Sequence, residues 1–291
     1  MSSYSWNIFR YIGDGLRAAA CFALLSQVCF NRSVAGFSRS TQVLILLLCT
    51  SRYLDLFALE QHTYLVFFKL YFIGSALLTL VIFCVLSDSY DKPKDTCSLA
   101  LIVVPSFLTA LYISDELAVL EVMWTFSQML EGFAMVPQYI FSYRDDVSRR
   151  RGVVTYMMFM GVYRTFYVLN WLYKKHRMPH YVDVQSWIGG AINICFFLDY
   201  LMYQFMGASA LRRLTLGTDD GFHRVSHELK QRFGACLLAP TSEEVRSNVV
   251  ELGLSSAPQQ KPGYAPVRLG ASSEAEDDAA LPPQQRPSLS V

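Results

Sequence analysis

Charged side chains recur at helical spacing inside segments that are otherwise apolar. Arg10, Asp14 and Arg17 follow one another at intervals of four and three residues, so on a helix they share one face. Arg52 and Asp55 stand one helical turn apart in the next apolar segment. A charge at the centre of a membrane helix costs about 2.5–3.5 kcal/mol on insertion scales, so each one needs a partner or a water-filled cavity. The spacing therefore predicts a polar site inside the protein, with ion pairs that only lock helices together as the alternative.

Many of these polar and aromatic residues fall toward the same end of their predicted helices. The set comprises Arg10, Asp14, Arg52, Asp55, Glu121, Trp124, Trp171, Lys174 and Asp183. A cavity lined by cations and carboxylates suits a small ligand with charges of both signs, such as the end of a peptide. An arginine fork holds a carboxylate through two parallel hydrogen bonds, which gives direction as well as energy.

Signatures of catalysis and of metal binding are missing from the sequence. It contains no paired Ser/His/Asp set and no glycine-rich phosphate loop, and its seven cysteines show no zinc-type spacing. We therefore expect neither an enzyme nor a metal or organic cofactor. The 25 basic and 24 acidic residues give a net charge of +1, which argues against a nucleic-acid partner.

The elements that position these residues are apolar segments of membrane-spanning length. The chain is 53% hydrophobic and 17% charged over 291 residues, which is typical of a membrane protein. The segments are 11–30, 41–59, 64–86, 98–113, 117–141, 153–173 and 184–207. They predict an all-α membrane protein with seven transmembrane helices.

A change of composition divides the chain near residue 215. We expect a transmembrane domain over residues 1–215 and a disordered tail over 216–291, because the tail is rich in Ser, Pro, Gln and Ala. A short amphipathic stretch around Val225 to Leu238 is the possible exception. Lys and Arg are concentrated in the loops 31–40, 87–97 and 142–152 and at the start of the tail. The positive-inside rule then places the N terminus in the lumen and the C terminus in the cytosol.

Several blocks of sequence closely resemble the KDEL receptor family. They include Asn7 to Asp14, Thr50 to Phe57, Leu120 to Ser127, Pro137-Gln138 and Gly161 to Trp171. The resemblance implies a PQ-loop/SWEET-like fold of two three-helix bundles joined by a linking helix. It also implies a receptor in endoplasmic reticulum and Golgi membranes. Such a receptor binds the C-terminal Lys-Asp-Glu-Leu-like tetrapeptide of escaped luminal proteins in the acidic Golgi and releases it at neutral pH, with protons as the coupling ligand.

The resemblance also implies roles for individual residues. Arg52 is expected at the terminal carboxylate of the peptide, and Arg10 at its acidic side chains. With the residues that converge at one end, the expected signal-binding set is Arg10, Arg52, Tyr53, Asp55, Glu121, Trp124, Tyr167, Trp171, Lys174 and Asp183. The expected pH-switch or conformational set is Arg17, Glu131, Tyr163 and Asp199, in which Glu131 and Tyr163 form a hydrogen-bonded pair.

The chain departs from the family pattern at two of these positions. Arg17 stands where the family typically has a pH-sensing histidine, and arginine does not titrate in the physiological range. Lys174 stands where the family typically has an arginine, and it lacks the bidentate fork. Both departures leave open a divergent family member that acts as a trafficking adaptor and binds no signal. A PQ-loop small-solute transporter is a second alternative, but it predicts a pore of uncharged polar groups, and the cluster of charges argues against it.

At the start of the tail, residues 212–215 resemble a basic sorting element of the family. Arg212 and Arg213 occupy the positions of lysines that serve there in vesicle coat recruitment, and Thr215 occupies the position of a phosphorylated serine. We expect a vesicle coat complex as the cytosolic partner of this element.

Overall fold

The computed structural model describes residues 7–57, 62–114, 116–144 and 150–237, and every regular element in these ranges is helical. The longer helices are α1 (Ile8–Asn31), α2 (Arg39–Arg52), α3 (Thr63–Val85), α4 (Leu99–Ile113), α5 (Val119–Phe133), α6 (Val136–Arg144), α7 (Arg151–Arg177), α8 (Val184–Met206) and α9 (Arg212–Leu237). Short 3-10 turns are η2 (Leu54–Phe57), η3 (Ser87–Ser89) and η4 (Lys92–Lys94). The prediction of an all-helical protein is confirmed for this part of the chain.

Each of the seven apolar segments contains a helix, but the helices differ in whether they are long and apolar enough to cross a membrane. By length and composition α1, α3 and α8 qualify as spans, whereas α4 is apolar but shorter. The fifth segment forms two helices, because α5 ends at Phe133 and α6 begins just before Pro137, whose ring has no N–H to donate to a continuous helix. The arrangement of seven spans therefore stays a prediction.

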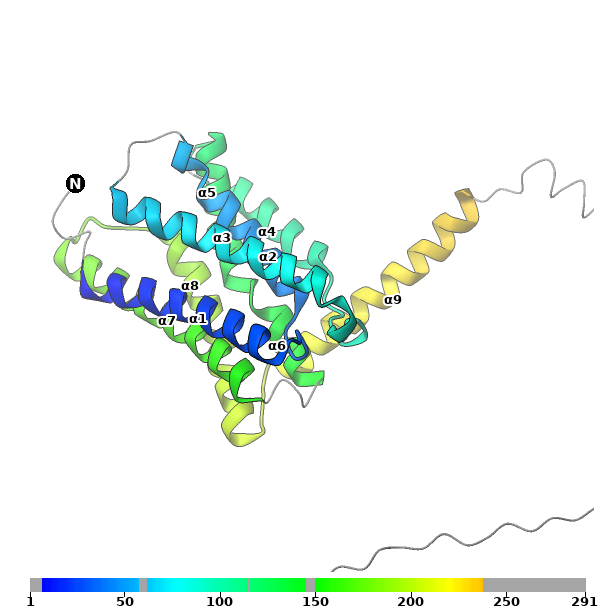
Figure 1. Cartoon of the computed structure of the whole chain (residues 1–291). Coiled ribbons are helices and arrows are strands. Elements are labelled where there is room, and N and C mark those ends of the chain that lie inside the picture. The colour runs from blue at the N-terminus through cyan, green and yellow to red at the C-terminus, as the bar shows by residue number, and fades with distance from the viewer. Residues whose placement is uncertain (1–6, 58–61, 115, 145–149, 238–291) are drawn as a thin grey trace, which may run out of the picture. The chain divides into compact units, whose positions relative to one another are not determined.

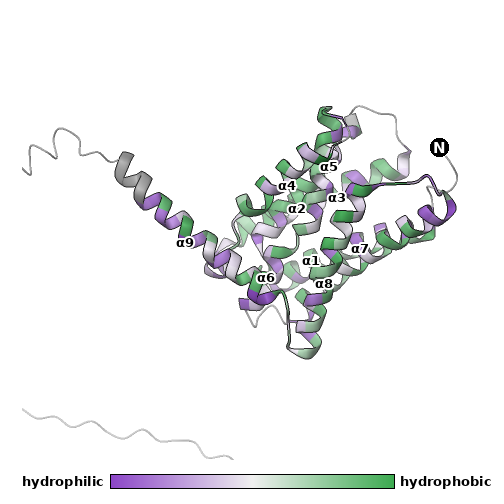
Figure 2. Cartoon of the chain, turned by 180° about the vertical axis from the view of Figure 1, so that it is seen from behind, coloured by the Kyte–Doolittle hydropathy of each residue, from purple (hydrophilic) through white to green (hydrophobic). Residues whose placement is uncertain are grey.

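The helices α1 to α8 pack side by side (Figure 1). α1 lies along α7 and also contacts α3, while α2 contacts α3, α5 and α6. α5 in turn packs on α4 and on α8, and α8 packs on α7. The bundle helices are largely hydrophobic in colour, while α9 is mixed (Figure 2). Large apolar side chains such as Val81, Val85 and Leu108 are more than half exposed on the outside, as expected of a surface that faces lipid.

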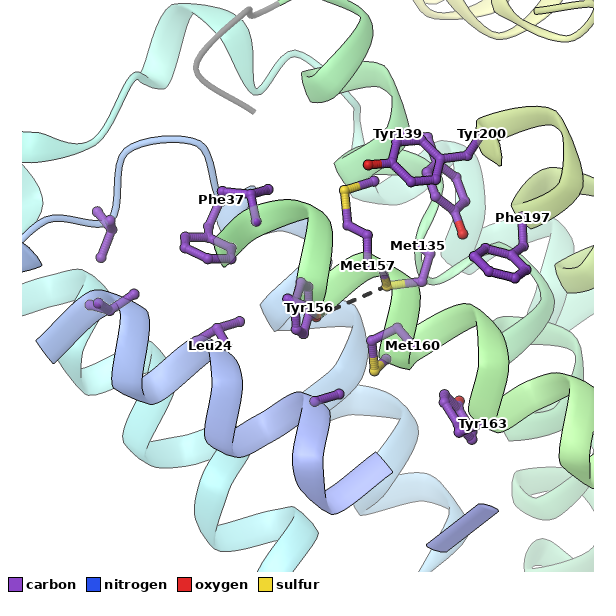
Figure 3. Packing of buried hydrophobic residues seen from close by; sticks show 14 of the residues in the cluster. Leu24, Phe37, Met135, Tyr139, Tyr156, Met157, Met160, Tyr163, Phe197 and Tyr200 are labelled. Atoms are coloured by element: carbon purple, nitrogen blue, oxygen red, sulfur yellow. Dashed lines mark hydrogen bonds between the residues drawn. The ribbon is translucent and has the colours of Figure 1, made fainter. Parts of the chain in front are cut away.

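Two clusters of buried side chains form the interior. The first lies between α1, α7 and α8 and includes Tyr156, Met157 and Tyr163, with Phe197 and Tyr200 packed beside them (Figure 3). The second lies between α2, α3, α4 and α5, and its most buried members are Leu44, Cys49, Ala110 and Leu130. The interior is therefore shared between helices from both halves of the chain.

Gln138 fixes the turn between α1 and α2 to α6. Its side chain accepts a hydrogen bond from the Ser38 N–H at 2.8 Å and donates one to the Gly36 carbonyl at 2.9 Å. The Ser38 hydroxyl caps α2 by accepting from the Thr41 N–H, and it donates to Asp95 at 2.8 Å. The Pro-Gln pair thus breaks one helix and anchors a turn that is distant in sequence.

Helix α9 differs from the disorder that composition predicts from residue 216 on. It begins at Arg212 and covers the amphipathic stretch expected from Val225, while residues 238–291 lie outside the described part of the chain. Two ion pairs help to explain this difference, because Arg144 at the end of α6 pairs with Asp219 at 3.1 Å and with Asp220 at 2.7 Å. The compact unit that contains the bundle also contains α9 as far as Ala235, and the domain boundary at residue 215 stays a prediction.

The close approach of α5 and α8 yields a prediction about stability. A Cβ atom at Gly189 would lie 2.3 Å from the backbone carbonyl oxygen of Gln128, so Gly189→Ala forces the two helices apart. We expect a loss of about 1–3 kcal/mol, typical of overpacking. Thermal unfolding of the purified protein in detergent measures it.

Gly74→Ala in α3 is the matched control, since a Cβ atom there would meet nothing within 4 Å. Alanine also favours helix over glycine. Equal unfolding temperatures for the two variants would contradict the close contact between α5 and α8.

Candidate functional site

A cavity of about 270 Å³, here called the central cavity, lies among α1, α2, α3, α5, α7 and α8. All of the expected signal-binding residues except Asp55 and Glu121 line it. Those that line it are Arg10, Arg52, Tyr53, Trp124, Tyr167, Trp171, Lys174 and Asp183. The convergence inferred from the sequence is therefore present in the geometry.

Asp55 and Glu121 lie outside the lining of the central cavity. Asp55, in η2, accepts two hydrogen bonds from the ammonium group of Lys69, at 2.7 and 2.8 Å. Glu121 stands in the first turn of α5, one turn before Trp124, which does line the cavity. The spacing of Arg52 and Asp55 suggests a pair, but each of them has its ion-pair partner on another helix.

Positively charged groups outnumber carboxylates along the lining. The cations are Arg10, Arg17, Arg52, Lys69, Arg164 and Lys174, and the carboxylates are Asp14 and Asp183. Such an excess of positive charge in a partly enclosed space favours a ligand with several negative charges. The expected sets contain neither Lys69 nor Arg164. Lys69 could have been found, because it is the single charged residue within α3 and charges inside apolar helices are functional by default.

The carboxylate of Glu131 joins three helices and bonds to two residues of the cavity lining. It accepts hydrogen bonds from the Tyr163 hydroxyl at 2.7 Å and from Arg164 Nη1 at 2.5 Å, both on α7. It also forms an ion pair with Arg52 Nη1, from α2, at 2.8 Å. The structure thus brings together the expected pair Glu131 and Tyr163, and it adds two guanidinium groups that share one carboxylate.

Arg52 is oriented by α5 as well as by Glu131. Its Nε donates to the Ser127 hydroxyl and its Nη2 donates to the Ser127 carbonyl, both at 3.0 Å. The Ser127 hydroxyl in turn donates to the Trp124 carbonyl at 2.6 Å. This geometry fixes the guanidinium plane at the wall of the cavity.

Arg164 retains hydrogen-bonding capacity inside the site. The side chain is almost fully buried and lies over the Trp171 ring at 4.9 Å. Among the described residues, its Nε and Nη2 have no hydrogen-bond partner. The Oε1 atom of Gln128, which also lines the cavity, has none either. Buried donors without an acceptor are costly, so these groups can bind a polar ligand at little further cost.

Asp14 and Arg17 have neutral partners. Asp14 accepts hydrogen bonds from the hydroxyls of Tyr64, at 2.9 Å, and Tyr167. The guanidinium of Arg17 donates to the Tyr53 hydroxyl and to the Cys49 sulfur, both at 3.2 Å. Within the described ranges no carboxylate pairs with Arg17, which therefore brings an uncompensated positive charge to the inner wall.

Tyr181 and Asp183, in the segment between α7 and α8, also line the cavity. The Tyr181 hydroxyl donates to the Asp183 carboxylate at 3.2 Å. Burial and the neighbouring charge of Asp183 raise the pKa of Tyr181, so that it stays a neutral donor. Asp183 also caps α8 by accepting from the Ser186 N–H at 3.0 Å.

Asp199 forms its hydrogen bonds away from Glu131 and Tyr163, two other members of the expected switch set. It accepts from the Tyr143 hydroxyl at 2.9 Å and from the N–H groups of Ala210 and Leu211 at 2.7 and 3.0 Å. Its geometry is that of a group that fixes the start of α9.

The expected sorting residues lie in the first turn of α9. Both arginines are exposed, and Arg212 donates a hydrogen bond to the Tyr143 carbonyl at 3.3 Å. Thr215 is buried, and its hydroxyl donates to the Leu211 carbonyl at 3.0 Å.

Comparisons with known proteins agree on one family. A model of the family described as ER lumen protein retaining receptor matches residues 33–174. The chain is 37% identical to an ER lumen protein-retaining receptor of Petunia hybrida over 204 residues, which is 68% of this chain and 94% of the relative. It is 34% identical to ER lumen protein-retaining receptor B of Arabidopsis thaliana, over 72% of this chain and 99% of the relative. The chain is 33% identical to ER lumen protein-retaining receptor 3 of Xenopus laevis, over 67% of this chain and 90% of the relative.

The shared carboxylate yields a prediction about stability. Glu131→Gln keeps the side-chain shape but leaves Arg52 and Arg164 without their counterion. We expect a loss of about 3–5 kcal/mol, as for a buried ion pair that loses one partner. Thermal unfolding in detergent measures it.

Tyr163→Phe is the control, because it removes one hydrogen bond from the same carboxylate and no charge. We expect a smaller loss of about 1.5–3 kcal/mol. If the two variants lost equal stability, charge compensation would not be what Glu131 contributes.

Proposed function

The chain belongs to the family of ER lumen protein-retaining receptors, and from this premise we propose how its central cavity binds a retrieval signal. It is a receptor for the C-terminal Lys-Asp-Glu-Leu-like signal of escaped endoplasmic-reticulum luminal proteins, which it returns from the Golgi. The observation that carries the proposal is the excess of cations around the cavity. A peptide with this ending has two acidic side chains and a terminal carboxylate, so its negative charges match that lining.

In this proposal the terminal carboxylate binds between Arg52 and Arg164. Ser127 holds the guanidinium of Arg52 at the cavity wall, and the Nε and Nη2 donors of Arg164 have no partner among the described residues. A carboxylate that accepts from a guanidinium forms the strong, charge-assisted type of hydrogen bond. The burial of these two arginine side chains favours a chain end over an internal peptide segment.

The remaining groups of the ligand then meet the outer part of the cavity. Arg10 and Lys174 pair with the acidic side chains, and Asp183 faces the basic end. Trp124, Tyr167 and Trp171 form apolar walls against the stems of the ligand's side chains. Asp55 and Glu121 take part only if they move toward the ligand, since neither lines the cavity.

We further propose a topology that fits this role. Seven helices span the membrane as two three-helix bundles with a linking helix, the PQ-loop/SWEET-like arrangement. The cavity end of the bundle then faces the lumen, and the end that carries α9 faces the cytosol. There the exposed Arg213 is the sorting residue best placed to meet a vesicle coat.

Proton coupling is the part of the proposal most affected by Arg17. Arginine stays charged at every physiological pH, so this position attracts anions in both compartments. The proton that favours binding in the Golgi must then act on another group, and we propose Glu131, whose carboxylate competes with that of the ligand for both arginines of the site.

Peptide binding tests the proposed function directly. A labelled peptide ending in Lys-Asp-Glu-Leu should bind the purified full-length protein at about pH 5.5 and more weakly at about pH 7.2, which bracket the usual histidine range. Amidation of its C terminus, or Arg52→Gln, should each weaken binding by about 10- to 150-fold, because a charge-assisted hydrogen bond is lost. Fluorescence anisotropy measures the affinity.

Arg213→Gln is the matched control, since this arginine is exposed on α9 and outside the cavity. Its affinity should equal that of the unmodified protein. Binding that is indifferent to amidation would contradict a site for a terminal carboxylate.

Arg17→His tests the origin of the pH response. A histidine with its ordinary pKa near 6.5 is mostly charged at pH 5.5 and mostly neutral at pH 7.2, so the positive charge is lost as pH rises. We expect the ratio of affinities at the two pH values to grow by about fivefold relative to the unmodified protein. Arg17→Lys keeps the charge and should leave the ratio unchanged. An unaltered ratio in Arg17→His would show that the charge at position 17 does not act on the ligand.

A further inference from the structure

Helix α9 begins next to the membrane end of α8. α8 stops at Met206, where Gly207 adopts a left-handed conformation with φ of 70°, and α9 starts at Arg212. Asp199, in α8, accepts the N–H groups of Ala210 and Leu211. Because the connection between Met206 and Arg212 is short and held by these hydrogen bonds, α9 must start at the level where α8 leaves the bilayer.

The next turns of α9 are fastened to loops at the same end of the bundle. Asp219 is fully buried, where it pairs with Arg144 and accepts a hydrogen bond from Thr96. His223 Nε2 lies 2.5 Å from the Thr96 carbonyl oxygen. Thr96 precedes α4 and Arg144 ends α6, so these bonds hold α9 against the ends of other helices and not as a straight extension of α8.

Beyond these anchors α9 has an apolar side, here called the α9 stripe. It consists of Leu214, Phe222, Val225 and Leu229, whose spacing places them on one face of the helix. Leu214 is 63%, Val225 56% and Leu229 47% exposed. The mixed colour of α9 in Figure 2 shows the same alternation of apolar and polar residues. A stripe of large apolar side chains in water is unfavourable, so it calls for a partner.

The charge of the distal part of α9 indicates which partner. Beyond the anchors the sequence of α9 contains three basic residues and one acidic residue. They are Arg224, Lys230 and Arg232, and Glu228. A basic helix with an apolar stripe is the pattern of helices that lie in the interface of anionic membranes. The bilayer that α8 crosses lies next to the start of α9, whereas a partner protein would first have to bind there.

We propose that α9 is a membrane-surface helix that binds anionic phospholipid headgroups, with the α9 stripe inserted among the lipid chains on the side where α8 ends. This inference goes beyond signal binding, since the central cavity contains no residue of α9. It requires only that the chain spans a membrane. The lipid contact adds a second, composition-sensitive attachment at the end of the bundle opposite the ligand.

The test uses the full-length protein in nanodiscs of phosphatidylcholine with or without phosphatidylserine. An environment-sensitive fluorescent amino acid is introduced at Val225, on the stripe, or at Gln231, which is exposed on the opposite face. With phosphatidylserine present, we expect quenching by aqueous iodide to be at least about threefold weaker at position 225 than at 231. The difference should shrink in high salt or without phosphatidylserine, because headgroup attraction is screened or lost.

A double substitution links the result to the stripe. Val225→Glu with Leu229→Glu should restore quenching of a probe at Phe222, whereas the control Gln231→Glu should not. Retrieval-peptide binding by the same samples reports that the bundle is folded. Equal quenching at 225 and 231 in anionic nanodiscs would overturn the proposal, and protection that is independent of phosphatidylserine would overturn the assignment to anionic lipid.

Discussion

The carboxylate of Glu131 lies where α2, α5 and α7 meet, and it is shared by two guanidinium groups and a tyrosine hydroxyl. A buried ion pair adds little to stability when it is compared with apolar packing, but it is expensive to break. Arg52 and Arg164 can therefore be accommodated inside the bundle only while these helices stay in register. The same contact fixes both arginines at the wall of the cavity, so the packing of the bundle and the shape of the site depend on one side chain.

One carboxylate cannot compensate two guanidinium groups, and Arg17 adds a third nearby with only neutral partners. The inner wall of the cavity thus carries a net positive charge in surroundings where charge is poorly screened. Its electrostatics favour an anion that enters from the open end. A ligand that ends in a carboxylate meets this requirement, whereas an uncharged solute would leave Arg164 with unsatisfied donors. This contrast separates a receptor for a charged peptide end from a transporter of neutral molecules.

The sequence located most of the site, because charges inside apolar segments are rare and helical spacing shows which of them share a face. Arg10, Asp14 and Arg17 line the cavity as their spacing predicted. Partners across helices could not be read from spacing: Arg52 bonds to α5, while Asp55 bonds to Lys69 on α3. α9 differs from the predicted disorder for a related reason. Composition describes the cost of ordering a segment, but it does not reveal that Arg144, distant in sequence, supplies ion pairs to Asp219 and Asp220.

The arginine at position 17 changes how the site can respond to protons. A titrating cation at this place would lose its attraction for an anionic ligand as pH rises, whereas a guanidinium keeps it. In the function proposed above, release at neutral pH then requires a competing negative charge. Glu131 is placed to compete, because it already holds Arg52 and Arg164 on the side of the cavity. In the proposed function the carboxylate of the ligand competes with Glu131 for the same two guanidinium groups, so a proton taken up by Glu131 would favour binding.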